Sequence, residues 1–152
     1  MLLHTLATLA YRGAKAVRGA PEGFAGFRIA DKSRTPGQIL AHLGDLLDWA
    51  LGLAKGEHNW HDSEPLDWTQ GTQRFFAALE AFGAVLESDL PLQCAPEKLF
   101  QGPIADALTH IGQISMLRRL AGAPVLGENY FLARITADRL GADQPAAIRE
   151  FE

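Results

Sequence analysis

The sequence contains little cysteine: Cys94 is the only one among 152 residues. A single cysteine excludes a disulfide bond within the chain. A chain of this length buries about two thirds of the surface that its unfolded form exposes, which is enough for a hydrophobic core without cross-links. The apolar fraction of 47% and the charged fraction of 21% are typical of folded globular proteins rather than disordered ones. We therefore expect one domain that spans residues 1–152.

Basic clusters and long apolar runs are also lacking. The 14 Lys and Arg residues against 18 Asp and Glu give a net charge of −4, and the only adjacent arginines are Arg118 and Arg119. Nucleic-acid-binding proteins present clustered basic side chains, so we expect no nucleic-acid partner. No window approaches the roughly 18 apolar residues of a membrane span. The opening segment MLLHTLATLAYRGAK lacks the basic start of a signal peptide. We expect no membrane partner and a cytoplasmic location.

Apolar residues instead recur at helical spacing in segments separated by glycine or proline. The first such segment covers about 2–18, and a long irregular connection follows over 19–34. The second helix is predicted to begin at Thr35, because proline and glutamine follow it one and three residues later and complete a capping box. Gly56 is the predicted end of this helix. No alternating pattern typical of strands competes with these helices.

Three further helices are predicted after a polar loop. The third begins at Asp67, with Gln70 completing a second capping box, and ends before Pro91. The fourth runs over 102–122, and a shorter fifth covers about 128–140. The sequence thus predicts an all-α fold: an antiparallel four-helix bundle with a long first connection and a short C-terminal fifth helix.

Three polar residues lie within or beside the predicted apolar stripes. Asp106 and His110 are four residues apart on the fourth helix, so their side chains project from the same face. His42 interrupts the apolar stripe of the second helix. A carboxylate and an imidazole at this spacing, joined by an imidazole from a facing helix, form the ligand set of a catalytic zinc site with an open fourth position. The same pattern fits a buried polar network without metal, and the sequence leaves both open.

The loop after the second helix carries weaker candidates. His58 and His61 could line the mouth of a pocket or be solvated loop residues. Trp49, Trp60 and Trp68 flank the same region and could wall a ligand cavity or pack at the end of the bundle.

Two strings resemble motifs of the DinB superfamily of metal-binding four-helix bundles. TPGQILAHLGDLL is similar to the family motif T-x-x-E-hydrophobic-hydrophobic-x-H, and DALTHIGQISMLRRLAGAP is similar to H-x-x-x-H-x-G-Q followed by a leucine-rich stretch. The matching residues are Thr35, Gln38, Ile39, Leu40, His42, His110, Gly112 and Gln113. The resemblance spans the second through the fourth helix. Asp106 stands where most members have a histidine, which is similar to the mycothiol-dependent maleylpyruvate isomerase branch, where a glutamate takes that position.

The resemblance implies that His42, Asp106 and His110 bind a divalent transition metal. This donor set suits zinc or nickel, and iron(II) is also compatible with it. The characterised branches of the family, which include bacillithiol transferases, act as thiol S-transferases or thiol-dependent isomerases. The resemblance therefore implies a metal-dependent enzyme with a small-molecule substrate and a low-molecular-weight thiol. A metal-dependent hydrolase and a non-catalytic dimeric module stay open as alternatives, and a homodimer through exposed apolar faces is expected. No catalytic acid or base is identifiable outside the three residues.

Overall fold

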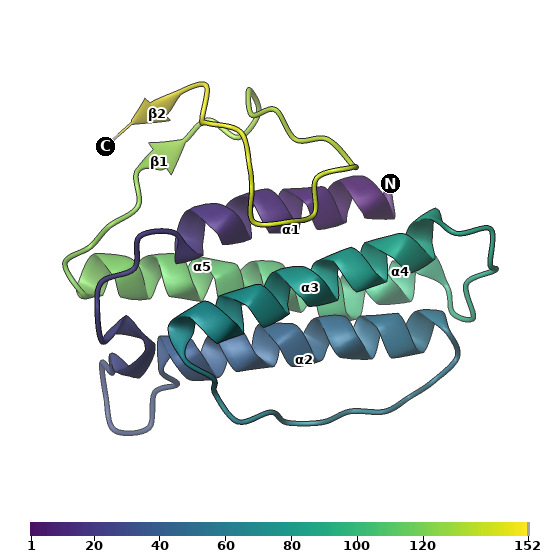
Figure 1. Ribbon diagram of the computed structural model, residues 1–152, viewed down its shortest axis with the longest axis horizontal. Coiled ribbons are helices and arrows are strands. Elements are labelled where there is room, and N and C mark those ends of the chain that lie inside the picture. The colour runs from purple at the N-terminus through teal and green to yellow at the C-terminus, as the bar shows by residue number, and fades with distance from the viewer. Residues whose placement is uncertain (152) are drawn as a thin grey trace.

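A computed structural model describes residues 1–151, and the chain is mostly helical (Figure 1). Its elements are α1 (Leu2–Val17), the 3-10 turn η1 (Phe24–Gly26), α2 (Pro36–Ala54), α3 (Trp68–Glu87), α4 (Pro96–Leu99), the π-helical turn η2 (Phe100–Ile104), α5 (Ala105–Leu120), and the two-residue strands β1 (Gly127–Glu128) and β2 (Glu150–Phe151). The predicted all-α class is confirmed, since the only sheet in the described residues is this short antiparallel pair. Among residues 1–151, no helix has both the length and the apolar character to cross a membrane.

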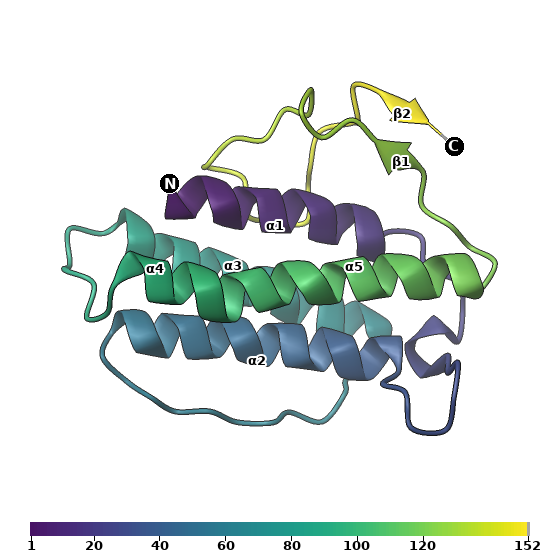
Figure 2. The ribbon, with the colours of Figure 1, turned by 180° about the vertical axis from the view of Figure 1, so that it is seen from behind.

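The four long helices lie side by side around one apolar core (Figure 1). α2 packs against α3 and α5, and α1 packs against the same two helices. Seen from behind, α5 lies between α1 and α2 (Figure 2). Burial of the apolar helix faces predicted from the sequence provides the main stabilisation of this arrangement. The largest fully buried side chains include Leu6, Leu9, Leu40, Leu43, Leu47, Phe75, Leu79, Phe82, Leu99, Ile104 and Ile114.

The predicted start of α2 is confirmed in detail. Thr35 Oγ1 accepts a hydrogen bond of 3.2 Å from the Gln38 backbone, and Gln38 Oε1 accepts one of 2.9 Å from the Thr35 backbone. These two bonds satisfy donors that a helix start would otherwise leave unpaired. Gly56 follows the end of α2 with a φ of 86°, a left-handed conformation that favours glycine. At α3, Asp67 caps the helix by accepting a 2.8 Å bond from the Gln70 backbone.

The prediction that the fourth helix begins at residue 102 is wrong. The helical chain begins at Pro96, and Pro103 lies inside it, within the π-helical turn η2. Proline has no backbone N–H, and its ring clashes with the carbonyl four residues earlier in an α-helix. A π turn is one of the ways in which a helix accommodates this disruption. Gly102 and Pro103 therefore resemble a helix start in the sequence, yet they mark an irregular turn directly before α5.

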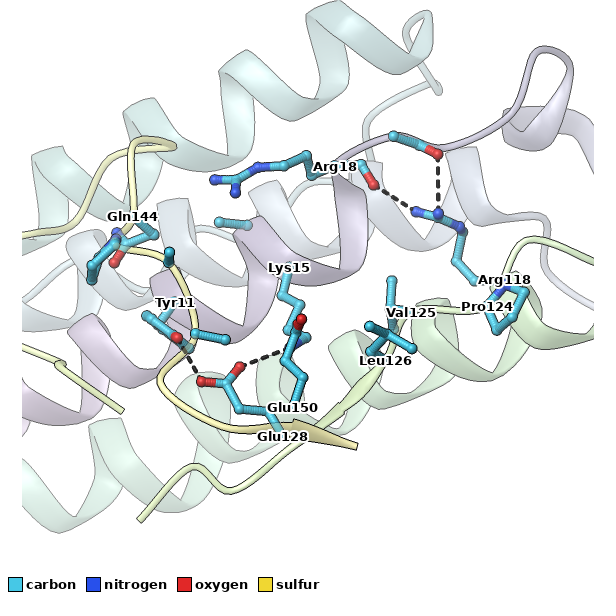
Figure 3. Close-up of a pocket in the computed structure, with 15 residues that line it drawn as sticks. Tyr11, Lys15, Arg18, Arg118, Pro124, Val125, Leu126, Glu128, Gln144 and Glu150 are labelled. Atoms are coloured by element: carbon cyan, nitrogen blue, oxygen red, sulfur yellow. Dashed lines mark hydrogen bonds and ion pairs between the residues drawn. The ribbon is translucent and has the colours of Figure 1, made fainter. Parts of the chain in front are cut away.

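The prediction of a fifth helix over about 128–140 is also wrong. This segment is irregular and runs beside α1, the yellow part of the chain that follows it crosses α1, and β1 and β2 pair nearby (Figure 1). The buried carboxylate of Glu128 accepts hydrogen bonds from Tyr11 Oη at 2.6 Å and from Lys15 Nζ at 2.8 Å (Figure 3). A helix this short is marginal by itself in water. The contacts with α1 hold the segment in an extended path instead.

Candidate metal centre

The three residues predicted as metal ligands meet where α2 packs against α5. Asp106 Oδ2 lies 3.7 Å from His42 Nε2, and Asp106 Oδ1 lies 3.5 Å from His110 Nε2. The two imidazole rings are nearly perpendicular, at 89°, with their centroids 4.7 Å apart. One potential ligand atom from each residue lies within 4.8 Å of the others. Residues 64 positions apart in the sequence thus form one cluster of nitrogen and oxygen donors.

The donor spacing fits a single small cation. A tetrahedral ion with bonds of about 2.0 to 2.1 Å holds its donors about 3.3 Å apart. The two distances from Asp106 to the imidazole nitrogens, each measured from a different carboxylate oxygen, exceed this by a few tenths of an ångström, and one ligand atom from each of the three residues lies within 4.8 Å of the others. Although aspartate is one methylene shorter than glutamate, Asp106 reaches both histidines. Two imidazoles and one carboxylate suit zinc, nickel or iron(II), and three protein ligands leave a coordination position open.

The cluster is most exposed to solvent at Asp106. The Asp106 side chain is 48% exposed, whereas the side chains of His42 and His110 are 16% and 10% exposed. The histidines are therefore held between the helices, and the carboxylate lies at the accessible edge. A small molecule would reach the cluster from the side of Asp106.

Gln113 fixes the orientation of His110. Its Oε1 lies 2.8 Å from His110 Nδ1. A carbonyl oxygen only accepts hydrogen bonds, so this contact suits a ring that is protonated on Nδ1 and that leaves Nε2, which faces Asp106, available for a metal ion. This arrangement is the one by which neighbouring groups orient metal-binding histidines. Gln113 belongs to the motif that resembles the DinB superfamily, but this role was not predicted, although its position one turn after His110 could have indicated it.

The environment of His42 favours its neutral form. Burial lowers the pKa of this imidazole, and repulsion from His110 and Arg34 lowers it further, while Asp106 acts in the opposite direction. A histidine with a lowered pKa stays uncharged near neutral pH, and only the uncharged ring binds a metal. The electrostatics of the cluster are therefore compatible with ligation.

Three tryptophans were candidates for the wall of a ligand cavity, and two of them lie beside the cluster. The Trp60 ring meets the His42 ring edge to face, with centroids 5.5 Å apart, and Trp49 meets Trp60 in the same way at 5.8 Å. They form an aromatic wall on the His42 side. The suggestion that Trp68 also lies there is wrong, because its ring packs 5.1 Å from that of Phe24, near the start of α3.

A second cluster of possible ligands consists of Asp45, Asp48 and His61. Here a cation is already supplied by the protein, since Arg74 Nη2 lies 2.7 Å from a carboxylate oxygen of both Asp45 and Asp48. His61 Nε2 lies 3.1 Å from Asp45 Oδ1. The positive guanidinium between the two carboxylates would repel a metal ion. We interpret this cluster as an ion-pair network that ties α2 to α3 and to the loop between them.

The spacing of residues in the sequence did not predict this network. Arg74 lies across Gly44, where an added Cβ would be 2.5 Å from the Arg74 Nη1 atom, so glycine is required for the approach. Ser63 donates to both oxygens of Asp45, at 2.9 Å through its backbone and 2.7 Å through its hydroxyl. Burial raises the pKa of Asp45, but these hydrogen bonds and Arg74 outweigh it, so that the pKa lies below its ordinary value. The sequence feature that could have indicated this network is the carboxylate of Asp45 next to Gly44 within the apolar stripe of α2.

A charged cavity of about 320 Å³ lies between α1 and the C-terminal segment (Figure 3). Its charged side chains bind one another or the backbone. Lys15 binds Glu128 and Glu150, and the guanidinium of Arg118 donates to backbone carbonyls that include those of Ala16 and Gly19. We interpret these contacts as the attachment of the C-terminal segment to the helices.

Comparison with known proteins finds no family model that matches this chain, and no curated protein or solved structure that does so. The function is therefore inferred from the side chains themselves.

Proposed function

We propose that this protein is a metal-dependent enzyme of the DinB-like type, an antiparallel four-helix bundle in which His42, Asp106 and His110 bind one divalent transition metal. The observation that carries the proposal is the approach of two imidazoles and a carboxylate from two helices to within 4.8 Å. The contact of His110 with Gln113, which orients the ring, and the lowered pKa of His42, which favours its neutral form, support it. Zinc and nickel suit these donors best, and iron(II) is also compatible.

The proposed reaction is transfer of a low-molecular-weight thiol to an electrophilic small molecule, or a thiol-dependent isomerisation. A bound cation of this kind lowers the pKa of a coordinated thiol or water and so provides a nucleophile at neutral pH. His42 and His110 would hold the ion, and the exposed edge at Asp106 would admit the thiol. Trp60 packs against the ring of His42 on that side of the cluster. Hydrolysis by a coordinated water is the alternative reaction at the same site.

Metal analysis tests the site directly. Protein purified without an affinity tag or chelator is expected to contain or accept about one equivalent of zinc, nickel or iron(II), and Asp106→Ala and His110→Ala are expected to lose it. Gln113→Leu keeps the ligands but removes the group that orients His110, so metal affinity should fall about 10- to 100-fold. Asp48→Asn, which changes a carboxylate in the Arg74 network, is the control and should retain full binding. Failure to bind any of the three metals after reconstitution would refute the site.

A non-catalytic module is the second candidate, favoured by the direct contacts of Asp106 with both histidines. In that case the triad is a polar network, and His42→Ala should lower the stability of the metal-free protein and change no metal content. The enzyme proposal expects the opposite: metal is lost, and the metal-free fold is largely retained. Thiol transfer would be abandoned if metal-loaded protein conjugated none of the common cellular thiols to a panel of electrophiles.

A further inference from the structure

An apolar groove adjoins the candidate metal centre. It has a volume of about 450 Å³ and begins at His110 and Gln113 of α5. From there its floor follows α5 through Leu117 to Leu120. Residues 110 and 120 are separated by about 15 Å along a helix axis. The groove thus shares His110 with the ligand cluster and is long enough for an extended chain.

The rim of this groove exposes large apolar side chains. Ile29, Met116 and Leu120 are 56%, 54% and 54% exposed, although they adjoin the buried residues Ile39 and Leu117. Contiguous exposed apolar surface around a concavity is typical of binding sites. The volume also lies within the roughly 300 to 1,000 Å³ of small-molecule sites. These features favour a small apolar occupant.

One positive charge lies on the same groove. Arg34, from the connection before α2, lines it together with His110. Its guanidinium forms no ion pair with a carboxylate in the described residues 1–151. Arginine binds carboxylates through strong, charge-assisted hydrogen bonds. A ligand with an anionic group would satisfy this charge.

We propose that the groove binds an anionic amphiphilic small molecule, with its carboxylate at Arg34 and its apolar chain along α5 over Met116 and Leu120. This names the substrate class of the proposed enzyme and rests on that function for the reaction. Binding of the ligand's apolar chain requires only the groove and not the reaction. The two proposals can therefore fail separately.

Calorimetric titration with three probes tests the inference: octanoate, butanoate and 1-octanol, each with metal-free and zinc-treated protein. Octanoate is expected to bind at least tenfold more tightly than butanoate, because four additional methylenes are buried. Met116→Glu should weaken octanoate binding more than tenfold by placing a negative charge on the rim. Arg34→Gln should abolish the preference for octanoate over 1-octanol. Leu90→Gln changes an exposed leucine in the loop before α4 and serves as the control, with unchanged affinity.

Several outcomes would overturn the inference. They are equal affinities for octanoate and butanoate, an unaffected Met116→Glu variant, or a control variant that loses as much affinity as Met116→Glu. A wild-type dimer that Met116→Glu converts to a monomer, with no octanoate binding, would assign the groove to a second copy of the chain instead. Octanoate binding without any metal binding would support the groove and refute the proposed enzyme. Metal binding without octanoate binding would support the proposed metal site and refute the groove as a binding site for octanoate.

Discussion

At the scale of single residues, Asp45 shows how this protein keeps a buried carboxylate ionised. Asp45 is almost fully buried, yet Ser63 and Arg74 supply hydrogen bonds and charge that hold its pKa below the ordinary value. A group whose pKa is depressed by folding stabilises the protein fully above its unfolded pKa of about 3.9. That contribution is lost as the pH falls through the lower, folded pKa. The stabilising effect of Asp45 is therefore present at neutral pH and disappears in acid.

We predict that Asp45→Asn lowers the free energy of unfolding by about 2 to 4 kcal/mol at pH 7, because it removes the buried partner of Arg74. The difference from the wild type should shrink in acid, once the wild-type carboxylate is itself protonated. Urea unfolding at pH 7 and near pH 3 measures both values. Asp48→Asn is the control, since Asp48 is half-buried and its loss should cost about 1 kcal/mol or less. A cost for Asp45→Asn that does not change with pH would contradict this account.

The residues of the candidate site were predictable to different degrees. His42, Asp106 and His110 were identified because helical spacing fixes which side chains share a face, and facing helices bring such faces together. The contact of Trp60 with His42 and the partners of Asp45 were not predicted, because their positions depend on the path of the loop between α2 and α3. That path is set by contacts such as those of Ser63 and Arg74 with Asp45, which no local pattern encodes.

At the scale of the elements, local chemistry predicted helix starts better than helix continuity. The capping box at Thr35 and the N-cap at Asp67 were correct, because side-chain bonds to the first turn depend only on neighbouring residues, but Gln70 does not complete the second capping box. Pro103 misled the prediction because proline is common at helix starts, whereas here a π turn absorbs it within the helix. The supposed helix over 128–140 failed because contacts with α1 outweigh its weak helical preference.

The capping box at Thr35 allows a test at this scale. We predict that Thr35→Ala lowers the free energy of unfolding by about 1 kcal/mol, since one donor of the first turn of α2 loses its acceptor. Thermal unfolding monitored by circular dichroism measures the change. Thr69→Ala is the matched control: Thr69 is exposed in the first turn of α3, where alanine should be neutral or slightly stabilising. Equal effects of the two substitutions would show that the cap contributes nothing.

At the scale of the whole molecule, the candidate metal centre and the C-terminal segment lie on different sides. The segment after α5 crosses α1, whereas His42 lies on α2, on the far side of the helices (Figures 1 and 2). The segment is held by Glu128, whose buried carboxylate binds Tyr11 and Lys15. Burial raises the pKa of Tyr11, and the Glu128 carboxylate raises it further, so the phenol stays protonated and donates. Attachment of the segment should therefore be separable from metal binding.

We predict that Glu128→Ala lowers the free energy of unfolding by about 3 kcal/mol, because Tyr11 and Lys15 lose a buried, hydrogen-bonded anion. Hydrogen exchange should accelerate over 127–150, which depends on this anchor, while α2 and the zinc stoichiometry stay unchanged. Glu150→Gln is the control: Glu150 also binds Lys15 but is exposed, so its loss should cost about 1 kcal/mol or less. If exchange in α2 accelerated as much as in 127–150, Glu128 would be supporting the whole helical core. If instead Glu128→Ala cost no more than Glu150→Gln, the carboxylate would not be the anchor, and the apolar contacts of Leu140 with the core would have to hold the segment.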